Sequence, residues 1–181
     1  MIAVGCSKSS SPPSETNTQS VECGVERWQV KTLTDADAAS IDWTPIASSI
    51  RDQDTNVQVS VQEETPRMKF EEQVVSIPCT IVAFKQEDDS DIHLVLRNAL
   101  ADSMIAEIPN LSCAEAGTSP RAADFQSAHD WVTSHLGIPK SDFKSSNISV
   151  TVTGVLFQDF PHGQKGHANN YREIHPVIRI E

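Results

Sequence analysis

The sequence predicts a mainly β domain with one helix. Five segments show the alternation of apolar and polar residues that is typical of half-buried strands. One helical stripe of apolar residues lies between the third and the fourth of these segments. The resulting order, β-β-β-α-β-β with a long first strand, favours a five-stranded barrel of the OB type. A small α+β sandwich would give the same order and stays the alternative.

The first three strands are predicted over residues 73–85, 91–97 and 103–108. Pro78 interrupts the first of them, and we expect a break or bulge there, because proline has no N–H to donate to a neighbouring strand. Cys79 shares one face with the apolar residues of that strand, so it should lie in the core as a free thiol.

The helix is expected to start at Ser119 and Pro120, because serine caps helices and proline is tolerated in the first turn. Its apolar stripe ends before Gly137, and glycine commonly terminates helices. Two further strands follow over residues 148–157 and 173–180, where isoleucine and valine alternate with polar residues.

An N-terminal extension, residues 23–72, is expected to pack on the barrel of residues 73–181. Its pattern predicts a short strand over residues 26–31 and a second strand over residues 56–61. Between them a Thr-Pro pair predicts the start of a short helix over residues 44–51.

Residues 1–22 have the composition of a flexible tether, rich in Ser, Thr, Pro and charged residues. The four residues that end at Cys6 are similar to the lipobox of bacterial lipoproteins, in which the cysteine is lipidated after signal cleavage. The apolar run before Cys6 is shorter than that of a signal peptide, and no basic residue precedes it. We expect lipidation at Cys6 and an extracytoplasmic location, periplasmic or at the cell surface. An incidental cysteine in a disordered segment is the alternative.

The other cysteines predict one disulfide. Cys23 and Cys113 both lie in irregular stretches just outside predicted strands, so they are the expected pair, and an exported protein permits such a bond. No CxxC or Cys/His spacing is present, which excludes a structural zinc finger.

The charge balance argues against nucleic acid and anionic lipid as the main partners. Lysine and arginine number 14 and aspartate and glutamate 25, which gives a net charge of −11, and such a surface repels polyanions. No apolar run approaches the ~20 residues that a membrane span needs. The expected partner is a protein, a small molecule or a glycan, and membrane contact would occur only through an N-terminal lipid.

Two acid-x-His units mark the second and the fifth predicted strands, Asp91 with His93 and Glu173 with His175. In each unit the two side chains share the outward face and stand ~7 Å apart. Glu107, on the polar face of the third strand, would add a carboxylate. Imidazole and carboxylate together suit a divalent metal ion such as zinc. Solvated carboxylate–histidine pairs on the sheet surface are the favoured interpretation, and a metal site is the alternative.

The segment 159–172, which joins the last two strands, is rich in polar groups and glycine. In OB folds this loop commonly forms part of the ligand site, and long ordered loops are often functional. We therefore expect ligand contacts from this loop and from Arg97 on the second strand. The candidate ligand-binding residues of the loop are His162, Gly163, Gln164, His167, Asn169 and Asn170.

Several short motifs are distinctive as a set. They are CGVERW at 23–28 with VKT at 30–32, SDIHLVL at 90–96, MIAEIP at 104–109, DFPHGQ at 159–164 and EIHPV at 173–177. Through these motifs most of the chain from Cys23 onward resembles a family of uncharacterised exported bacterial proteins. The resemblance implies export and a shared fold, and it implies no particular activity.

Two functions from different classes are compatible with these observations. The first, which we favour, is an extracytoplasmic binding or interaction module that uses the loop before the last strand. The alternative is a metal-dependent hydrolase, nuclease-like by analogy with other OB folds, with Asp91 and Glu107 as metal ligand or base. His93 and His175 would then be ligands or acid–base groups, and Arg97 would contact a phosphate.

Overall fold

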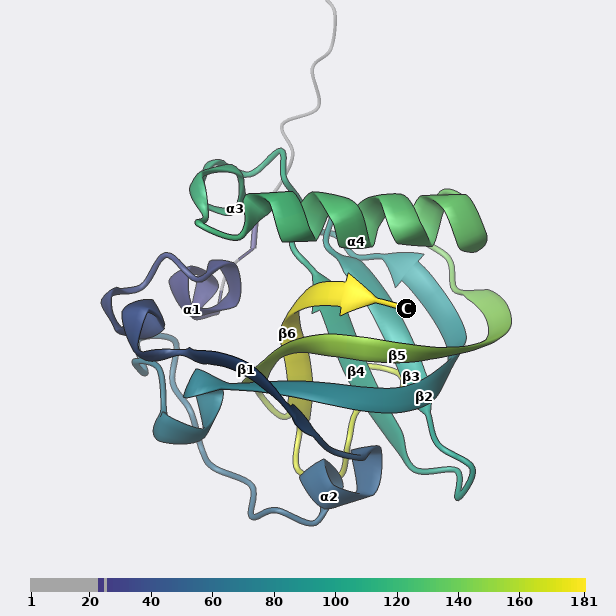
Figure 1. Cartoon of the computed structure of the whole chain (residues 1–181), viewed down its shortest axis with the longest axis horizontal. Coiled ribbons are helices and arrows are strands. Elements are labelled where there is room, and N and C mark those ends of the chain that lie inside the picture. The colour runs from purple at the N-terminus through teal and green to yellow at the C-terminus, as the bar shows by residue number, and fades with distance from the viewer. Residues whose placement is uncertain (1–22, 25) are drawn as a thin grey trace, which may run out of the picture.

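The computed structural model describes residues 23, 24 and 26–181, so the predictions for residues 1–22, lipidation of Cys6 included, lie outside the described residues. Figure 1 shows a strongly curved sheet with short helices around it. The strands are β1 (Asp42–Ala47), β2 (Gln73–Gln86), β3 (Ile92–Arg97), β4 (Ser103–Ile108), β5 (Lys144–Gln158) and β6 (Arg172–Ile180). The helices are α1 (Trp28–Thr32), α2 (Ile50–Asp54), α3 (Ala114–Thr118) and α4 (Ala122–His135), and 3₁₀ turns cover Ala36–Ser40 and Lys69–Glu72. The described chain is thus mainly β, as predicted.

The strands form one sheet whose hydrogen-bonded pairs close into a ring. The order is β1-β2-β3-β4-β6-β5, and β5 pairs again with β2. β1 lies outside the ring, parallel to β2, and β4 and β6 are also parallel. The other pairs are antiparallel. In Figure 1, β2 and β5 cross in front of β3 and β4, so the sheet folds back over its own inner face.

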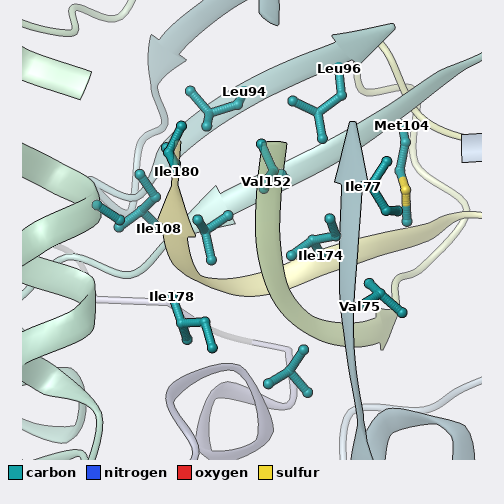
Figure 2. Packing of buried hydrophobic residues seen from close by; sticks show 14 of the residues in the cluster. Val75, Ile77, Leu94, Leu96, Met104, Ile108, Val152, Ile174, Ile178 and Ile180 are labelled. Atoms are coloured by element: carbon teal, nitrogen blue, oxygen red, sulfur yellow. The ribbon is translucent and has the colours of Figure 1, made fainter. Parts of the chain in front are cut away.

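Apolar side chains from all strands of the ring meet inside it. Figure 2 shows this core from close by, with side chains of β2, β3, β4, β5 and β6 directed toward one another. The labelled members are Val75, Ile77, Leu94, Leu96, Met104, Ile108, Val152, Ile174, Ile178 and Ile180. Cys79 belongs to the same core and is a free cysteine, as predicted. Burial raises the pKa of its thiol to about 12.

The predicted strands of the ring are confirmed, but the predicted break at Pro78 is wrong. β2 continues through Pro78, which pairs with Thr151, and the register shifts after Ile81 instead. On its other edge β2 pairs with β1 up to Ser76 and with β3 from Thr80 onward. On that edge Pro78 thus lies in the gap between the end of the β1 pairing and the start of the β3 pairing, where a missing N–H is tolerated.

α4 confirms the predicted helix and lies across one end of the sheet (Figure 1). It spans Ala122–His135 and is followed by Gly137, whose φ is 87°. Its stripe of Phe125, Ala128 and Val132 is buried in the core of the ring. α3, which precedes it, has no counterpart in the prediction.

The strand predicted at residues 26–31 is wrong, because this segment forms α1. Glu26 and Arg27 have positive φ angles of 54° and 60°, so the chain turns sharply into the helix. The guanidinium of Arg27 is buried against Glu71, with Nη2 and Oε2 2.6 Å apart. A tertiary contact thus overrides the local strand pattern.

The helix predicted over residues 44–51 is also misplaced. The first residues of the predicted helix belong to β1 instead. Pro45 is tolerated there because β1 is an edge strand. The helix α2 begins only after Ser49, whose Oγ accepts the backbone N–H of Asp52 at 3.1 Å as an N-cap. Residues 56–61 form no strand, and the second strand predicted in the extension is wrong.

The predicted disulfide between Cys23 and Cys113 is present, with Cα atoms 5.6 Å apart. It ties the start of the described chain to the residue that caps α3. Within residues 23, 24 and 26–181, no helix has the length and apolar character needed to cross a membrane.

Candidate functional site

β4 lies between β3 and β6 in the sheet, and this brings the two acid-x-His units together (Figure 1). His93 of β3 is the cross-strand partner of Glu107 in β4. On its other edge β4 pairs with β6 from Glu173 onward. The residues predicted as metal ligands therefore gather on the outer face of three neighbouring strands. We call them the acid–histidine cluster: Asp91, His93, Glu107, Glu173 and His175.

The expectation that these groups are solvated on the sheet surface is wrong. Asp91, His93 and His175 are 0% exposed, Glu107 is 4% exposed and Glu173 is 2% exposed. The outer face of β3, β4 and β6 is therefore a second buried region of the molecule, and a polar one.

Two segments cover the cluster. The loop between β5 and β6 packs closely on β3: a Cβ atom on Gly166 would lie 2.5 Å from Cγ1 of Val95, so a larger residue would not fit. The preceding carbonyl, that of Lys165, lies 3.1 Å from Nε2 of His93. From the other side α1 inserts Lys31, which is itself buried.

Glu107 is the centre of the cluster because its two oxygens contact two histidines. Oε1 lies 2.9 Å from Nδ1 of His93, and Oε2 lies 3.2 Å from Nδ1 of His175. Burial by itself raises the pKa of Glu107, but hydrogen bonds from His175 and His93 hold this pKa well below its ordinary value. Glu107 is therefore an ionised carboxylate.

Both ring nitrogens of His93 face acceptors. Nδ1 also lies 3.1 Å from Oε1 of Glu87, while Nε2 faces the carbonyl of Lys165. Burial lowers the pKa of His93, but Glu107 and Glu87 outweigh burial and raise the pKa to about 10. His93 is thus an imidazolium whose two N–H groups both donate.

Burial and neighbouring charges also shift the pKa values of Asp91, Glu173 and Lys31. Burial raises the pKa of Asp91 to about 8. Burial, together with repulsion from Asp159 and Glu107, raises the pKa of Glu173 well above its ordinary value. Burial lowers the pKa of Lys31, but the nearby carboxylates, led by Glu107, raise it above its ordinary value. Lys31 is therefore charged at neutral pH.

An open cleft of about 250 Å³ leads from solvent to Glu107. Carboxyl groups dominate its lining, and the one lysine is Lys31. The lining residues are Cys23, Glu26, Lys31, Glu87, Asp88, Asp89, Glu107, His162 and Gln164. We call this hollow the acidic cleft.

A neighbouring cleft of about 410 Å³ shares Glu87, His162 and Gln164 with the acidic cleft, and Glu87 forms an ion pair there with Lys85. Its character differs, because the ammonium groups of Lys85 and Lys165 lie 5.2 and 4.8 Å from the ring centre of Phe143. His162 and Gln164 thus separate an acidic hollow from a basic one.

The predicted ligand-binding residues of the loop fall into two groups. His162, Gly163 and Gln164 line the clefts. His162 is held in place by Asp159, whose Oδ2 lies 2.5 Å from Nε2, and this contact raises the pKa of His162. These three residues therefore border the candidate site, and their contact with a ligand stays a prediction.

The other predicted residues lie elsewhere. His167 stacks on Tyr171 with ring centres 4.6 Å apart. Asn169 and Asn170 hydrogen-bond to residues of α2, so they attach the loop to that helix. Arg97 is exposed at the opposite end of β3 from the cluster.

The sequence-based prediction missed Lys31, Glu87 and Asp159, and it also missed three acidic residues of the cleft lining, Glu26, Asp88 and Asp89. The Asp-x-x-His spacing of Asp159 and His162 was a usable signal, since it resembles the spacing of side chains that meet across one turn. Glu87 comes directly after β2, just before the turn that leads to β3. No local pattern indicates that Lys31 reaches the cluster from the extension.

A larger hollow, about 490 Å³, lies between α1 and residues 63–67. Its two arginines, Arg27 and Arg67, are already in ion pairs with Glu71 and Asp35. We therefore attribute this hollow to the packing of the extension and place the candidate site at the acidic cleft.

Comparisons with protein-family models, with curated proteins and with solved structures found no match. The resemblance to exported bacterial proteins accordingly stays a prediction.

Proposed function

We propose that the chain is an exported binding module whose acidic cleft receives a cationic group, an ammonium or a guanidinium. The observation that carries the proposal is the lining of the cleft, where five acidic residues surround about 250 Å³ and the single lysine is Lys31. A cation that enters exchanges part of its water shell for carboxylate oxygens, in a setting where charges interact more strongly than in water. The net charge of −11 adds attraction at longer range.

The loop before β6 supports recognition of a protein side chain. His162 and Gln164 form one wall of the acidic cleft. Gly163 borders open space, because a Cβ atom there would have no neighbour within 4 Å. The cleft suits one side-chain-sized group, so we expect the ligand to be a lysine or arginine of a partner protein or peptide.

Export and an OB-like barrel belong to the same proposal. The Cys23–Cys113 disulfide is the kind of bond that persists in oxidising compartments outside the cytosol. The closed ring of β2, β3, β4, β6 and β5, with α4 between β4 and β5 in the chain, supports the OB-like arrangement. Lipidation at Cys6 would attach such a module to a membrane surface.

A metal-dependent hydrolase is less well supported by the geometry. His93 and His175 are 0% exposed, so a substrate would not reach them. His93 uses both nitrogens as donors and has no lone pair for a metal or a proton. Arg97, the expected phosphate contact, lies four residues along β3 from His93, roughly 13 Å away.

The proposal is tested by titrating the protein with a tri-lysine peptide in a calorimeter at low and at physiological salt. We expect saturable binding that weakens as salt increases, and no binding of a tri-glutamate peptide. Absence of saturable binding to the tri-lysine peptide at low salt would overturn the proposal.

Two charge-reversal variants separate the cleft from general surface attraction. Asp88→Lys changes an exposed residue of the cleft. It should weaken peptide binding by up to about thirtyfold, because it removes one exposed ion pair worth up to about 1 kcal/mol and adds a repulsion of similar size. Asp130→Lys makes the same charge change on the exposed face of α4 and should have little effect. Equal losses in both variants would contradict a role for the cleft.

A further inference from the structure

Two buried polar atoms at the bottom of the acid–histidine cluster face each other without a hydrogen-bond partner. Oδ2 of Asp91 and Nε2 of His175 are 3.6 Å apart, and both side chains are 0% exposed. Neither atom forms a hydrogen bond to any part of the chain that the structure describes. Most buried side-chain polar atoms in proteins are paired, so this pair indicates that something else binds here.

The second oxygen of Asp91 and the second ring nitrogen of His175 each have a partner, so only Oδ2 and Nε2 stay unpaired. Oδ1 of Asp91 accepts the backbone N–H of Asn110 at 2.7 Å. Nδ1 of His175 lies 3.2 Å from Oε2 of Glu107 and 3.3 Å from Oε1 of Glu173. Nδ1 of His175 thus faces two carboxyl groups, while Nε2 faces only the oxygen of Asp91.

A shared proton does not fit this gap, but a metal ion does. An O–H···N hydrogen bond joins atoms roughly 2.7–3.0 Å apart, whereas these two atoms are 3.6 Å apart. Zinc binds histidine nitrogen and carboxylate oxygen at about 2.1 Å. An ion at that distance from both atoms would see them at an angle of about 120°, close to the tetrahedral arrangement that zinc prefers.

We propose that Asp91 and His175 bind one divalent transition-metal ion, such as Zn²⁺, with Glu107 as the third group. One donor atom from each of these three residues lies within 4.8 Å of the other two. Glu107 would turn one oxygen toward the ion, which leaves Glu173, 3.3 Å from Nδ1, as the carboxyl group that orients His175.

The surroundings favour a borderline transition metal over calcium or magnesium. One imidazole among carboxylates suits Zn²⁺ and its neighbours, whereas Ca²⁺ and Mg²⁺ prefer oxygen ligands alone. Glu173 brings a further carboxyl group to the site, and the ring of Phe157 lies 5.7 Å from the His175 ring and shields it. Glu107 connects the site to the acidic cleft, which provides an entry path for a cation.

This metal site goes beyond the proposed peptide recognition and does not depend on it. Zinc would lie below the floor of the acidic cleft and stabilise β3, β4 and β6 from their outer face. The expected role of the ion is structural. Its ligands Asp91 and His175 are 0% exposed, so a bulky substrate would not reach the ion.

The test uses the full chain without a histidine tag, treated with chelator, and with Cys6→Ser to remove a competing thiol. Titration with ZnCl₂ should show one ion per chain and raise the melting temperature by about 5–10 °C at a hundredfold excess over Kd. MgCl₂ should produce no such rise. Zinc-edge anomalous scattering from crystals should place the ion about 2.1 Å from Asp91 and His175.

Matched variants decide whether the named residues bind the ion. His175→Gln should weaken zinc binding at least tenfold, whereas His129→Gln on α4 should leave it unchanged. If His175→Gln does not fold, Asp91→Asn serves, because its amide oxygen still accepts the N–H of Asn110. No saturable zinc binding, or an equal loss in His129→Gln, would overturn the proposal.

The outcomes for the two sites are distinguishable. Asp88→Lys should weaken binding of the tri-lysine peptide and leave the stoichiometry of zinc at one. His175→Gln should weaken zinc binding and leave binding of the tri-lysine peptide unchanged. Loss of both activities in His175→Gln, with the fold intact by circular dichroism, would show that there is one site rather than two and would contradict the separate metal site.

Discussion

Replacing Glu71 with glutamine should destabilise the protein severely, because Glu71 is buried and its oxygens hold three segments together. Oε1 and Oε2 accept two hydrogen bonds from the guanidinium of Arg27, at 2.7 and 2.6 Å. Oε1 also accepts the backbone N–H of Gln158 at 2.8 Å, and Oε2 that of Met68 at 2.7 Å. Glutamine has the same shape but turns one acceptor into a donor and leaves the Arg27 charge buried without a counter-charge.

The magnitude follows from the burial of both partners, whose side chains are 0% exposed. Removing one partner of such a pair costs about 3–5 kcal/mol, a large part of the roughly 5–15 kcal/mol that stabilises a typical domain. In urea unfolding followed by tryptophan fluorescence, an m-value of about 2 kcal/mol/M would convert this cost into a midpoint lower by about 1.5–2.5 M.

Glu72→Gln is the matched control, because it removes the neighbouring charge from a pair with Lys69, whose side chain is 91% exposed. It should cost less than about 1 kcal/mol. The double variant Arg27→Met/Glu71→Gln should be more stable than the sum of its single changes implies, since it leaves no unpaired charge. A midpoint for Glu71→Gln that matches that of Glu72→Gln would refute the reasoning.

Cys79 should not react with a thiol reagent such as DTNB at pH 8 until the protein unfolds, because burial raises its pKa to about 12; rapid reaction of the folded protein would contradict the buried position. Reducing the Cys23–Cys113 disulfide, which joins residues 90 positions apart, should lower the free energy of unfolding by about 2–5 kcal/mol, measured in urea with and without reductant. In chelator-treated protein the melting temperature should fall as pH rises from about 6.5 toward 10, because folded His93, with its pKa raised to about 10 from 6.5, keeps a proton that the unfolded chain releases. A melting temperature that rises across this window would show that His93 is not the imidazolium described above.

The ring strands and α4 could be predicted because their signal is local. Ile92, Leu94 and Leu96 alternate with other residues in β3, and that period fixes which side faces the core. Phe125 and Val132 define the buried stripe of α4 in the same way. The pairing of β6 with β4, which brings the two acid-x-His units together, is a non-local feature that this signal does not indicate.

The opposite side of β3 could not be predicted by the same rule. His93 and Val95 occupy the positions that alternation assigns to solvent, yet both are buried. The carbonyl that contacts His93 belongs to Lys165, 72 positions later in the chain. Alternation along one strand carries no information about a segment so distant. The burial of the cluster under the loop between β5 and β6 could therefore not be predicted.

The predictions for the N-terminal extension were wrong for a related reason, although one local signal for α2 was available. The turn at Arg27 depends on Glu71, 44 positions away, and no pattern within residues 26–31 indicates it. Ser49 and Asp52, in contrast, form a Ser-x-x-Asp start that marks α2 correctly. The Thr-Pro pair before it suits the edge strand β1 equally well.

The closure of the ring has a consequence for the order of folding. β3 and β4 are joined by a short turn and can pair as soon as they are made, but Val74 of β2 pairs with Val155 of β5, about 80 positions later. Until β5 exists, one edge of β2 has no partner, and such edges invite pairing with other chains. Native structure should therefore form late, after most of the chain has left the ribosome.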